Sequence, residues 1–464
     1  MTAWFTKIRQ HILSEAKSQA TAGRRLMSAK KFIILLSVFV GLIVGVGAEV
    51  LRFLIGTLTG RLWALMSVLD AGWLLVLLPV AGVVLCGIYC RYVVKDNMEF
   101  GCQRIRQALD GHRYRLRPHL IYAPIVSCAV TLGFGGSAGS EGPIAYAGAG
   151  IGSNVGKFFG LSPDTLRILV GCGAGAGIAG IFKAPVGGAL FAIEVLGMEL
   201  TTVSVLALVS CCLASWFTSY LCSGMTLDLP MHVTHGFDAA MIPGVLLLGL
   251  FCGLYSLYYS YVMGKTEGFI GKFRNPWVKN VVSGLLIGVG LFIFPALYGE
   301  GYGVAGDIIN GHPEGALTRS FFAGDSGRWV MLLFIGGVLL VKSASCALTN
   351  AGGGVGGDFA PTLFAGCMAG MFFSSCGNLL FGTSLSVADF AFFGMAGVMA
   401  GAIRAPLMAM FLTVEMSGNF GMFLPILLVS LVSFSTSRLL GHRVGVNLPP
   451  TWVHRDIDRL IARF

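Results

Sequence analysis

Long apolar runs separated by short charged segments dominate the hydropathy pattern of this chain. The runs of the first two thirds cover residues 32–58, 71–90, 166–195, 201–227, 239–264 and 280–298, and another begins at Trp329. A helix rises about 1.5 Å per residue, so about twenty apolar residues match the hydrocarbon core of a bilayer. The pattern predicts an all-α polytopic membrane protein.

The charged segments between the runs predict the topology and the domain boundaries. Residues 1–31 carry seven Lys and Arg against a single acid, Glu15, and the segments 91–117 and 265–279, which we predict to be loops, are also basic. Because cytoplasmic loops are enriched in Lys and Arg, we place these segments in the cytoplasm. The prediction is a basic N-terminal segment 1–31, a transmembrane domain 32–440 and a cytoplasmic tail 441–464. Segment 1–31 is either an amphipathic surface helix or a frayed tail. Residues 299–328 are predicted to be an extended polar surface segment.

Composition narrows the class further. The 464 residues are 55% hydrophobic and 12% charged, about half the charged fraction of a soluble domain, and 66 are glycine. Glycine-rich membrane helices pack closely and are often interrupted, which favours a transporter or channel. The net charge of +10 lies mainly in tails and loops, so no nucleic-acid partner is expected. The twelve cysteines show no CxxC spacing and the histidines are scattered, so we predict no metal site and no cofactor.

One acid stands alone in an apolar stretch. Between residues 121 and 161 the only charged side chains are Glu141 and Lys157. An isolated carboxylate inside a membrane is costly, and its default interpretation is functional. The glycines of GGSAGSEGP (135–143) favour a bared loop, and Pro143 suits the first turn of a helix. We therefore predict that Glu141 lies at a helix N-terminus, where N–H groups and the helix dipole create an anion site.

Two segments about 220 residues apart resemble each other. Residues 176–194 and 396–415 both contain a cation–Ala–Pro sequence with a glutamate nine residues beyond the proline, Glu194 in one and Glu415 in the other. Upstream, GSEGP (139–143) and GDFAP (357–361) correspond, which aligns Glu141 with Phe359. The pattern predicts two related halves, roughly 32–227 and 239–440, with a site where broken helices meet. We expect the two cations, Lys183 and Arg404, to anchor at the membrane interface.

These motifs resemble those of the CLC family of chloride channels and proton-coupled chloride exchangers. GSEGP at 139–143 is similar to that family's GREGP, and GGDFAP at 356–361 to its GGxFAP; residues 179–195 and 395–416 follow its two repeats. The resemblance covers roughly residues 32–440. It implies an inverted repeat of tilted and half-length helices, and a homodimer with one pore per subunit. It also implies location in a bacterial inner membrane with both termini in the cytoplasm.

The resemblance also implies roles for individual residues. Glu141 would be the gating carboxylate, competing with chloride for the anion site and released by protonation. Amides of Gly142, Asp358 and Phe359 would face the anion, while the Asp358 carboxylate is expected to cap the following helix. Glu194 and Glu415 are expected to be structural acids bound to backbone N–H groups of neighbouring half-helices. The implied anion-binding set is Gly139, Ser140, Gly142, Pro143, Gly357, Asp358, Phe359, Ala360 and Phe100.

Several positions depart from the family pattern. Phe100 falls where the family has a pore serine, no tyrosine follows Tyr302, Val195 replaces an inner glutamate, and Ser140 replaces the arginine of GREGP. These departures favour channel-like or loosely proton-coupled chloride transport over strict proton/chloride antiport, which remains the alternative. Two minor alternatives are a fluoride exporter, which Pro143 disfavours, and a non-conducting relative. Catalytic motifs such as HExxH and GxSxG are absent, so the chain is not predicted to be an enzyme.

Overall fold

The computed structural model describes residues 29–69, 72–96, 98, 101–227, 229–231, 238–317, 320–322 and 327–444. Within these ranges the chain is helical and forms no strand, apart from one isolated bridge between Gly139 and Gly357. The all-α prediction is therefore confirmed. The helices are α2 (Ala29–Val68), α3 (Leu74–Ile88), α4 (Gly101–Asp110), α5 (Ala123–Gly133), α6 (Glu141–Phe158), α7 (Pro163–Phe182), α8 (Pro185–Leu190), α9 (Thr202–Cys222), α10 (Ile242–Gly271), α11 (Pro276–Ile293), α12 (Tyr302–Ile309), α13 (Arg328–Ala351), α14 (Phe359–Leu380), α15 (Val387–Ile403), α16 (Pro406–Ser417) and α17 (Phe423–Val444).

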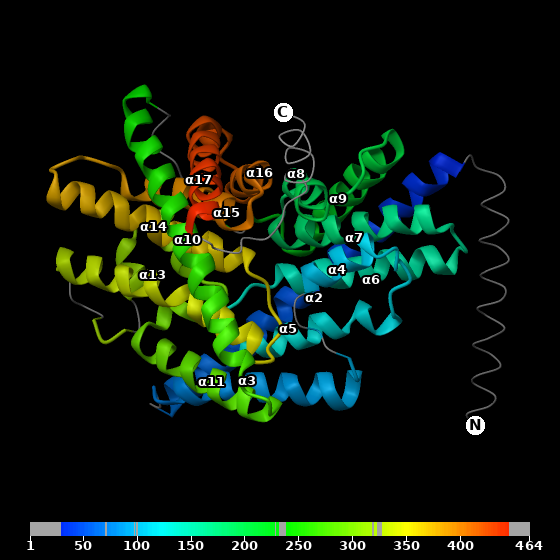
Figure 1. Cartoon of the computed structure of the whole chain (residues 1–464), viewed down its shortest axis with the longest axis horizontal. Helices are drawn as coiled ribbons and strands as arrows, with labels where there is room; N and C mark the ends of the chain where they lie inside the picture. Colours follow the sequence, from blue (N-terminus) through cyan, green and yellow to red (C-terminus); the bar gives the residue numbers. More distant parts are fainter. Residues whose placement is uncertain are drawn as a thin grey trace.

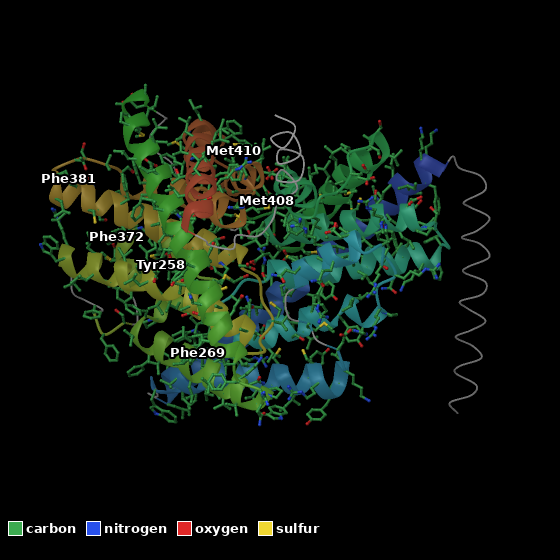
Figure 2. The ribbon with its side chains drawn as sticks, viewed as in Figure 1. Tyr258, Phe269, Phe372, Phe381, Met408 and Met410 are labelled. Atoms are coloured by element: carbon green, nitrogen blue, oxygen red, sulfur yellow. The ribbon has the colours of Figure 1, made fainter. Side chains whose placement is uncertain are left out.

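The outer surface is apolar, as a bilayer requires. In the described part of the chain, nine helical segments are long and apolar enough to cross a membrane. Large apolar side chains point outward, including Phe53 at 71% exposure, Leu333 at 73% and Phe381 at 81%. Phe381 lies at the outer edge of the molecule in Figure 2. The protein is thus an integral membrane protein whose outward-facing surface includes many large apolar side chains.

The two predicted halves share one packing scheme. In the first half α6 packs on α7, α2 on α9 and α7 on α9; in the second, α14 packs on α15, α10 on α17 and α15 on α17. Figure 1 shows α6 and α7 on one side of the molecule and α14 on the other, with α8 and α16 meeting between them. Helix α3 also packs on α11, joining the halves a second time. The broken helices of both halves therefore converge on one central region.

The repeat is reproduced in backbone conformation at the two cation–Ala–Pro junctions. Lys183 ends α7 with φ 52° and ψ 35°, and Arg404 ends α15 with φ 63° and ψ 35°. The following prolines, Pro185 and Pro406, begin α8 and α16. Both cations are buried, with 2% and 5% of their surface exposed, so the expectation that they anchor at the membrane interface is wrong. The Lys183 ammonium instead donates to the carbonyl of Thr226 at 2.7 Å.

A reciprocal pair of hydrogen bonds ties the loops that carry the site. The N–H of Ser137 donates to Thr349 Oγ1 at 3.0 Å, and the N–H of Val355 donates to Thr131 Oγ1 at 3.0 Å. Thr131 and Thr349 occupy equivalent positions, 218 residues apart, the same interval that separates Glu141 from Phe359. Each half therefore holds the loop of the other half, and the two loops are fixed side by side.

Three local predictions need correction. The run 166–195 is two helices and a π-helical turn, because Lys183 adopts a left-handed conformation and Pro185 starts a new helix. Segment 91–117 contains α4, and segment 299–328 is not simply an extended surface segment. It contains α12, whose Ala305, Ile308 and Ile309 are buried. The predictions for residues 1–28 and 445–464 fall outside the described residues.

Candidate functional site

Glu141 links the N-termini of two helices from opposite halves. It is the first residue of α6, and none of its surface is exposed. Its Oε1 accepts hydrogen bonds from the N–H groups of Phe359 at 2.6 Å and Ala360 at 3.0 Å, the first residues of α14. Its Oε2 is buried without a hydrogen-bond partner. The carboxylate therefore occupies the position at the start of α14 where N–H groups and the helix dipole favour an anion.

Glycines allow the loop before α6 and the loop before α14 to approach each other closely. Gly139 and Gly357 exchange both backbone hydrogen bonds, at 2.9 and 2.7 Å. A Cβ added to Gly357 would approach Glu141 Oε1 to 2.7 Å, and one added to Gly142 would approach the Gly357 Cα to 3.2 Å. Pro143 lies in the first turn of α6, where no intrahelical N–H donor is needed. The sequence-predicted residues 139–143 and 357–360 are thus brought together in space.

Asp358 does not cap α14 as expected. It is the N-cap residue of that helix, but its side chain accepts no hydrogen bond from the first turn. The expectation was wrong because two of the first N–H groups of α14 already donate to Glu141. Asp358 therefore contributes a second carboxylate near the same helix N-terminus without neutralising its N–H groups.

Ser140 is held from outside the predicted site. Its N–H and its hydroxyl both donate to Glu300 Oε1, at 2.8 and 2.5 Å. The Ser140 amide therefore bonds Glu300, whereas the amides of Phe359 and Ala360 bond Glu141. Phe100, the remaining predicted anion-site residue, lies outside the described residues.

Sequence reasoning missed two charged residues next to the site, Glu300 and Lys342. Lys342 is fully buried in α13, and its ammonium donates to Ser137 Oγ at 2.9 Å and to the Gly299 carbonyl at 3.3 Å. The signal was available, because Lys342 is the one charged side chain between residues 329 and 357. A lone cation in such a run deserves the same functional interpretation as a lone acid. Glu300 carried no such signal, because its segment resembled a polar surface loop.

Glu194 and Glu415 form a reciprocal pair of helix caps. Glu194 accepts from the N–H groups of Leu407 at 3.4 Å and Met408 at 2.8 Å, at the start of α16. Glu415 accepts from Val186 at 3.1 Å and Gly187 at 2.8 Å, at the start of α8. Met408 is labelled in Figure 2 near the centre of the molecule, where α16 meets α8. Each acid thus stabilises the N-terminus of a half-helix that belongs to the other repeat.

The chemistry of the site comes from backbone and side-chain groups of this chain. Among the described residues, no group of three or more His, Cys, Asp or Glu side chains could hold a metal ion. The site and its surroundings consist of backbone N–H groups, the three carboxylates of Glu141, Asp358 and Glu300, and the buried cation Lys342. Such an arrangement can bind an anion and exchange a proton at a carboxylate.

Comparison with known proteins identifies the family. A family model described as voltage gated chloride channel matches residues 81–438, more than half of the chain. The chain belongs to the voltage-gated chloride channel family. This membership confirms the resemblance drawn from the GSEGP and GGDFAP motifs. It also places the chain among channels and transporters that move anions across membranes.

Individual relatives of this chloride channel family member carry both channel and exchanger names. A chloride channel protein described as ClcB-like, from Ralstonia nicotianae, is 28% identical over 80% of this chain and 83% of its own length. An H+/Cl− exchange transporter, ClcA of Vibrio cholerae, is 27% identical over 74% of this chain and 71% of its own. The solved structure of a slow cyanobacterial Cl−/H+ antiporter, 23% identical, covers 94% of this chain and 99% of its own, with a TM-score of 0.75. The inverted-repeat fold is therefore shared.

Proposed function

We propose that this protein conducts chloride, or a similar anion, through a pathway gated by Glu141, with channel-like or loosely proton-coupled transport. The observation that carries the proposal is the position of Glu141 Oε1 on the N–H groups of Phe359 and Ala360. A carboxylate and a halide are both anions that backbone N–H groups at a helix N-terminus stabilise. Glu141 and the transported anion therefore compete for one place.

Protonation of Glu141 is the step that releases the site. A protonated carboxyl carries no charge and is a much weaker partner for the N–H groups than the carboxylate. Its Oε2 has no hydrogen bond that would hold the side chain in place. Loss of the charge therefore frees both N–H groups for an anion, and deprotonation returns the carboxylate to them.

Strict proton/chloride antiport is the second candidate. It is favoured by the exchanger name of the Vibrio cholerae relative, and by the second acid, Asp358, beside the first turn of α14. Against it stand Val195 in place of an inner glutamate and Phe100 in place of a pore serine. A fluoride exporter and a non-conducting relative are lesser candidates for the same fold.

The proposal extends to the assembly and the location of the protein, for which the family membership and the apolar surface are the support. We propose a homodimer with one pathway per subunit, in a bacterial inner membrane, with both termini in the cytoplasm. The basic segments 91–117 and 265–279 would then face the cytoplasm. Lipid would contact the exposed apolar side chains of the outer helices.

Chloride flux from liposomes tests the gate. Purified protein is reconstituted with a chloride gradient, and chloride efflux and proton uptake are recorded together at a series of external pH values. Wild-type efflux should rise as the pH falls, whereas Glu141→Gln should fix the neutral state and reduce the pH dependence to within about twofold. Glu314→Gln, at a side chain 71% exposed, is the control and should behave as wild type.

The outcomes separate the candidates. Glu141→Gln with an unchanged pH response would refute the gate. Proton uptake in fixed ratio to chloride efflux would favour strict antiport over the channel-like mode. No anion flux from well-folded wild-type protein would favour the non-conducting relative.

A further inference from the structure

Lys342 places a buried positive charge beside the loop that leads to Glu141. Its side chain is fully buried, and its ammonium bonds Ser137 Oγ at 2.9 Å and the Gly299 carbonyl at 3.3 Å. It also lies 4.9 Å from the centre of the Phe364 ring on α14. A buried ammonium is costly unless polar groups and negative charge compensate it. The interior around the gate must therefore supply such compensation.

Glu300 supplies a negative charge at the same place. It directly follows Gly299, and its Oε1 accepts from the N–H and the hydroxyl of Ser140 at 2.8 and 2.5 Å. Ser140 directly precedes Glu141. Lys342, Glu300 and Glu141 all lie within electrostatic reach of one another. Lys342 thus bonds Ser137, and Glu300 bonds Ser140, so both charges contact the loop that ends at Glu141.

Lys342 does not belong to the repeated scaffold. At the interval of 218 residues that relates Thr131 on α5 to Thr349 on α13, Lys342 on α13 corresponds to Pro124 on α5. The other half builds the same loop without a buried cation at this position. Folding of the loop therefore does not by itself require the lysine, which points to a role in the asymmetric part of the site.

We propose that Lys342 and Glu300 are positioning residues that tune, with opposite signs, how readily Glu141 takes up a proton, and so set the pH at which the anion pathway opens. The inference rests on the proposed gating role of Glu141. The negative charge of Glu300 disfavours the charged form of Glu141, whereas the positive charge of Lys342 favours it. Ser140 stands where the GREGP motif has an arginine, so the positive charge of that arginine is absent at this position.

Other titratable groups lie around Glu141, and none of them is altered in the variants that test the proposal. Asp358 adds a second acid at the start of α14, and it is left unchanged in every variant below. Among the described residues, thiols on three helices also lie within electrostatic reach of Glu141 or Glu300: Cys102 on α4, Cys128 on α5 and Cys346 on α13.

The sign of the pH shift tests the proposal. Full-length protein in liposomes is assayed for chloride efflux against external pH, and the midpoint of acid activation is compared between variants. Glu300→Gln removes a negative charge, so the midpoint should move down by about 1 pH unit. Lys342→Met removes a positive charge, so the midpoint should move up by a similar amount. The double variant should lie between the two, and Glu314→Gln should leave the midpoint unchanged.

A purely structural role predicts a different result. It would lower flux in both single variants without opposite shifts, and shifts of the same sign or no shifts would overturn the inference. If Lys342→Met does not fold, Glu300→Gln alone decides, since a midpoint that stays or rises contradicts the proposal. Glu141→Gln is measured beside them: a persistent pH response there refutes the gate itself. A lost response there with an unmoved Glu300→Gln midpoint refutes only the tuning role.

Discussion

Two kinds of glutamate meet helix N-termini in this protein, and they differ in how fully they are bonded. Glu194 and Glu415 each place both carboxylate oxygens on backbone N–H groups of the opposite half. Glu141 places both of its hydrogen bonds on Oε1 and leaves Oε2 buried without a partner. The first pair is reciprocal, whereas Glu141 is matched in the other half by Phe359. Glu194 and Glu415, with both oxygens bonded, suit a structural role that holds the two halves together. Glu141, with one oxygen unbonded, suits a group that exchanges with a ligand.

The difference arises from where the repeat is kept and where it is broken. The junctions at Lys183 and Arg404 keep the same backbone angles, and the Thr131 and Thr349 bonds are reciprocal. At the centre the second half supplies the N-terminus of α14, and the first half supplies Glu141, the acid that binds it. A symmetric frame thus holds an asymmetric site, and substitutions should separate the two.

The largest effect is expected from removing one reciprocal cap. Glu194→Ala or Glu415→Ala leaves two N–H groups at the start of a half-helix without their charged acceptor. Hydrogen bonds to charged groups contribute about 1.5–3 kcal/mol each, so the loss should exceed about 3 kcal/mol. Thermal unfolding in detergent should show both variants strongly destabilised, by similar amounts. Glu141→Gln should change the unfolding temperature much less, and equal losses in all three variants would contradict the distinction.

The next effect compares equivalent hydroxyls of the frame. Thr131→Val and Thr349→Val each remove one acceptor for a buried N–H, of Val355 and Ser137 respectively. Each threonine also donates to a carbonyl one turn earlier, at 2.9 and 2.8 Å, so the two environments match. Each substitution should lower the free energy of unfolding by about 1–2 kcal/mol. Urea or thermal unfolding of both variants checks this, and clearly unequal losses would show that the frame is not symmetric.

A smaller effect, on transport rather than stability, is expected at Gly139. A Cβ there would overlap both carboxylate oxygens of Glu141, while the backbone of Gly139 has no positive φ that would exclude alanine. Gly139→Ala should therefore displace the side chain of Glu141 and raise chloride efflux at neutral pH, by about three- to tenfold. Liposome efflux measures it, with Gly303→Ala as control because no atom lies within 4 Å of a Cβ at that position. Unchanged efflux would mean that Glu141 does not obstruct the pathway.

The sequence was sufficient for the frame and for the central acid. Glycine–proline turns, the repeat spacing and a lone acid predicted broken helices and the position of Glu141 at a helix N-terminus. Local pattern determines these features, because proline and glycine act within a few residues of their own position.

The rest depends on contacts between distant segments. We expected Glu194 and Glu415 to bind N–H groups of neighbouring half-helices, and the structure shows such bonds. That Glu194 bonds α16 and Glu415 bonds α8 follows from how the halves cross, which no local pattern encodes. Glu300 lies in a segment that was predicted to be at the surface. It accepts hydrogen bonds from Ser140 because the segment before α12 folds inward. Lys342 could have been found as an isolated cation, but its partner Ser137 could not.

The smallest effect concerns Asp358, the acid that neither caps α14 nor replaces Glu141. If its charge faces the anion site, it repels the ligand that the N–H groups of Phe359 and Ala360 attract. Asp358→Asn should then strengthen halide binding by about two- to fivefold, which corresponds to about 0.4–1 kcal/mol, a modest Coulomb energy for a partly screened pair. The measurement is isothermal titration of chloride in a Glu141→Gln background, where the competing carboxylate is absent.

Salt distinguishes repulsion from a change of shape. A Coulomb effect of Asp358 should shrink when ionic strength is raised with an anion that the site does not bind, because exposed parts of the interaction are screened. Asp389→Asn, which neutralises a buried acid in the first turn of α15, is the matched control and should leave halide affinity unchanged. Weaker binding in Asp358→Asn would show that this carboxylate supports the helix N-terminus indirectly. The asymmetric site would then extend from Glu141 to Asp358 as one unit.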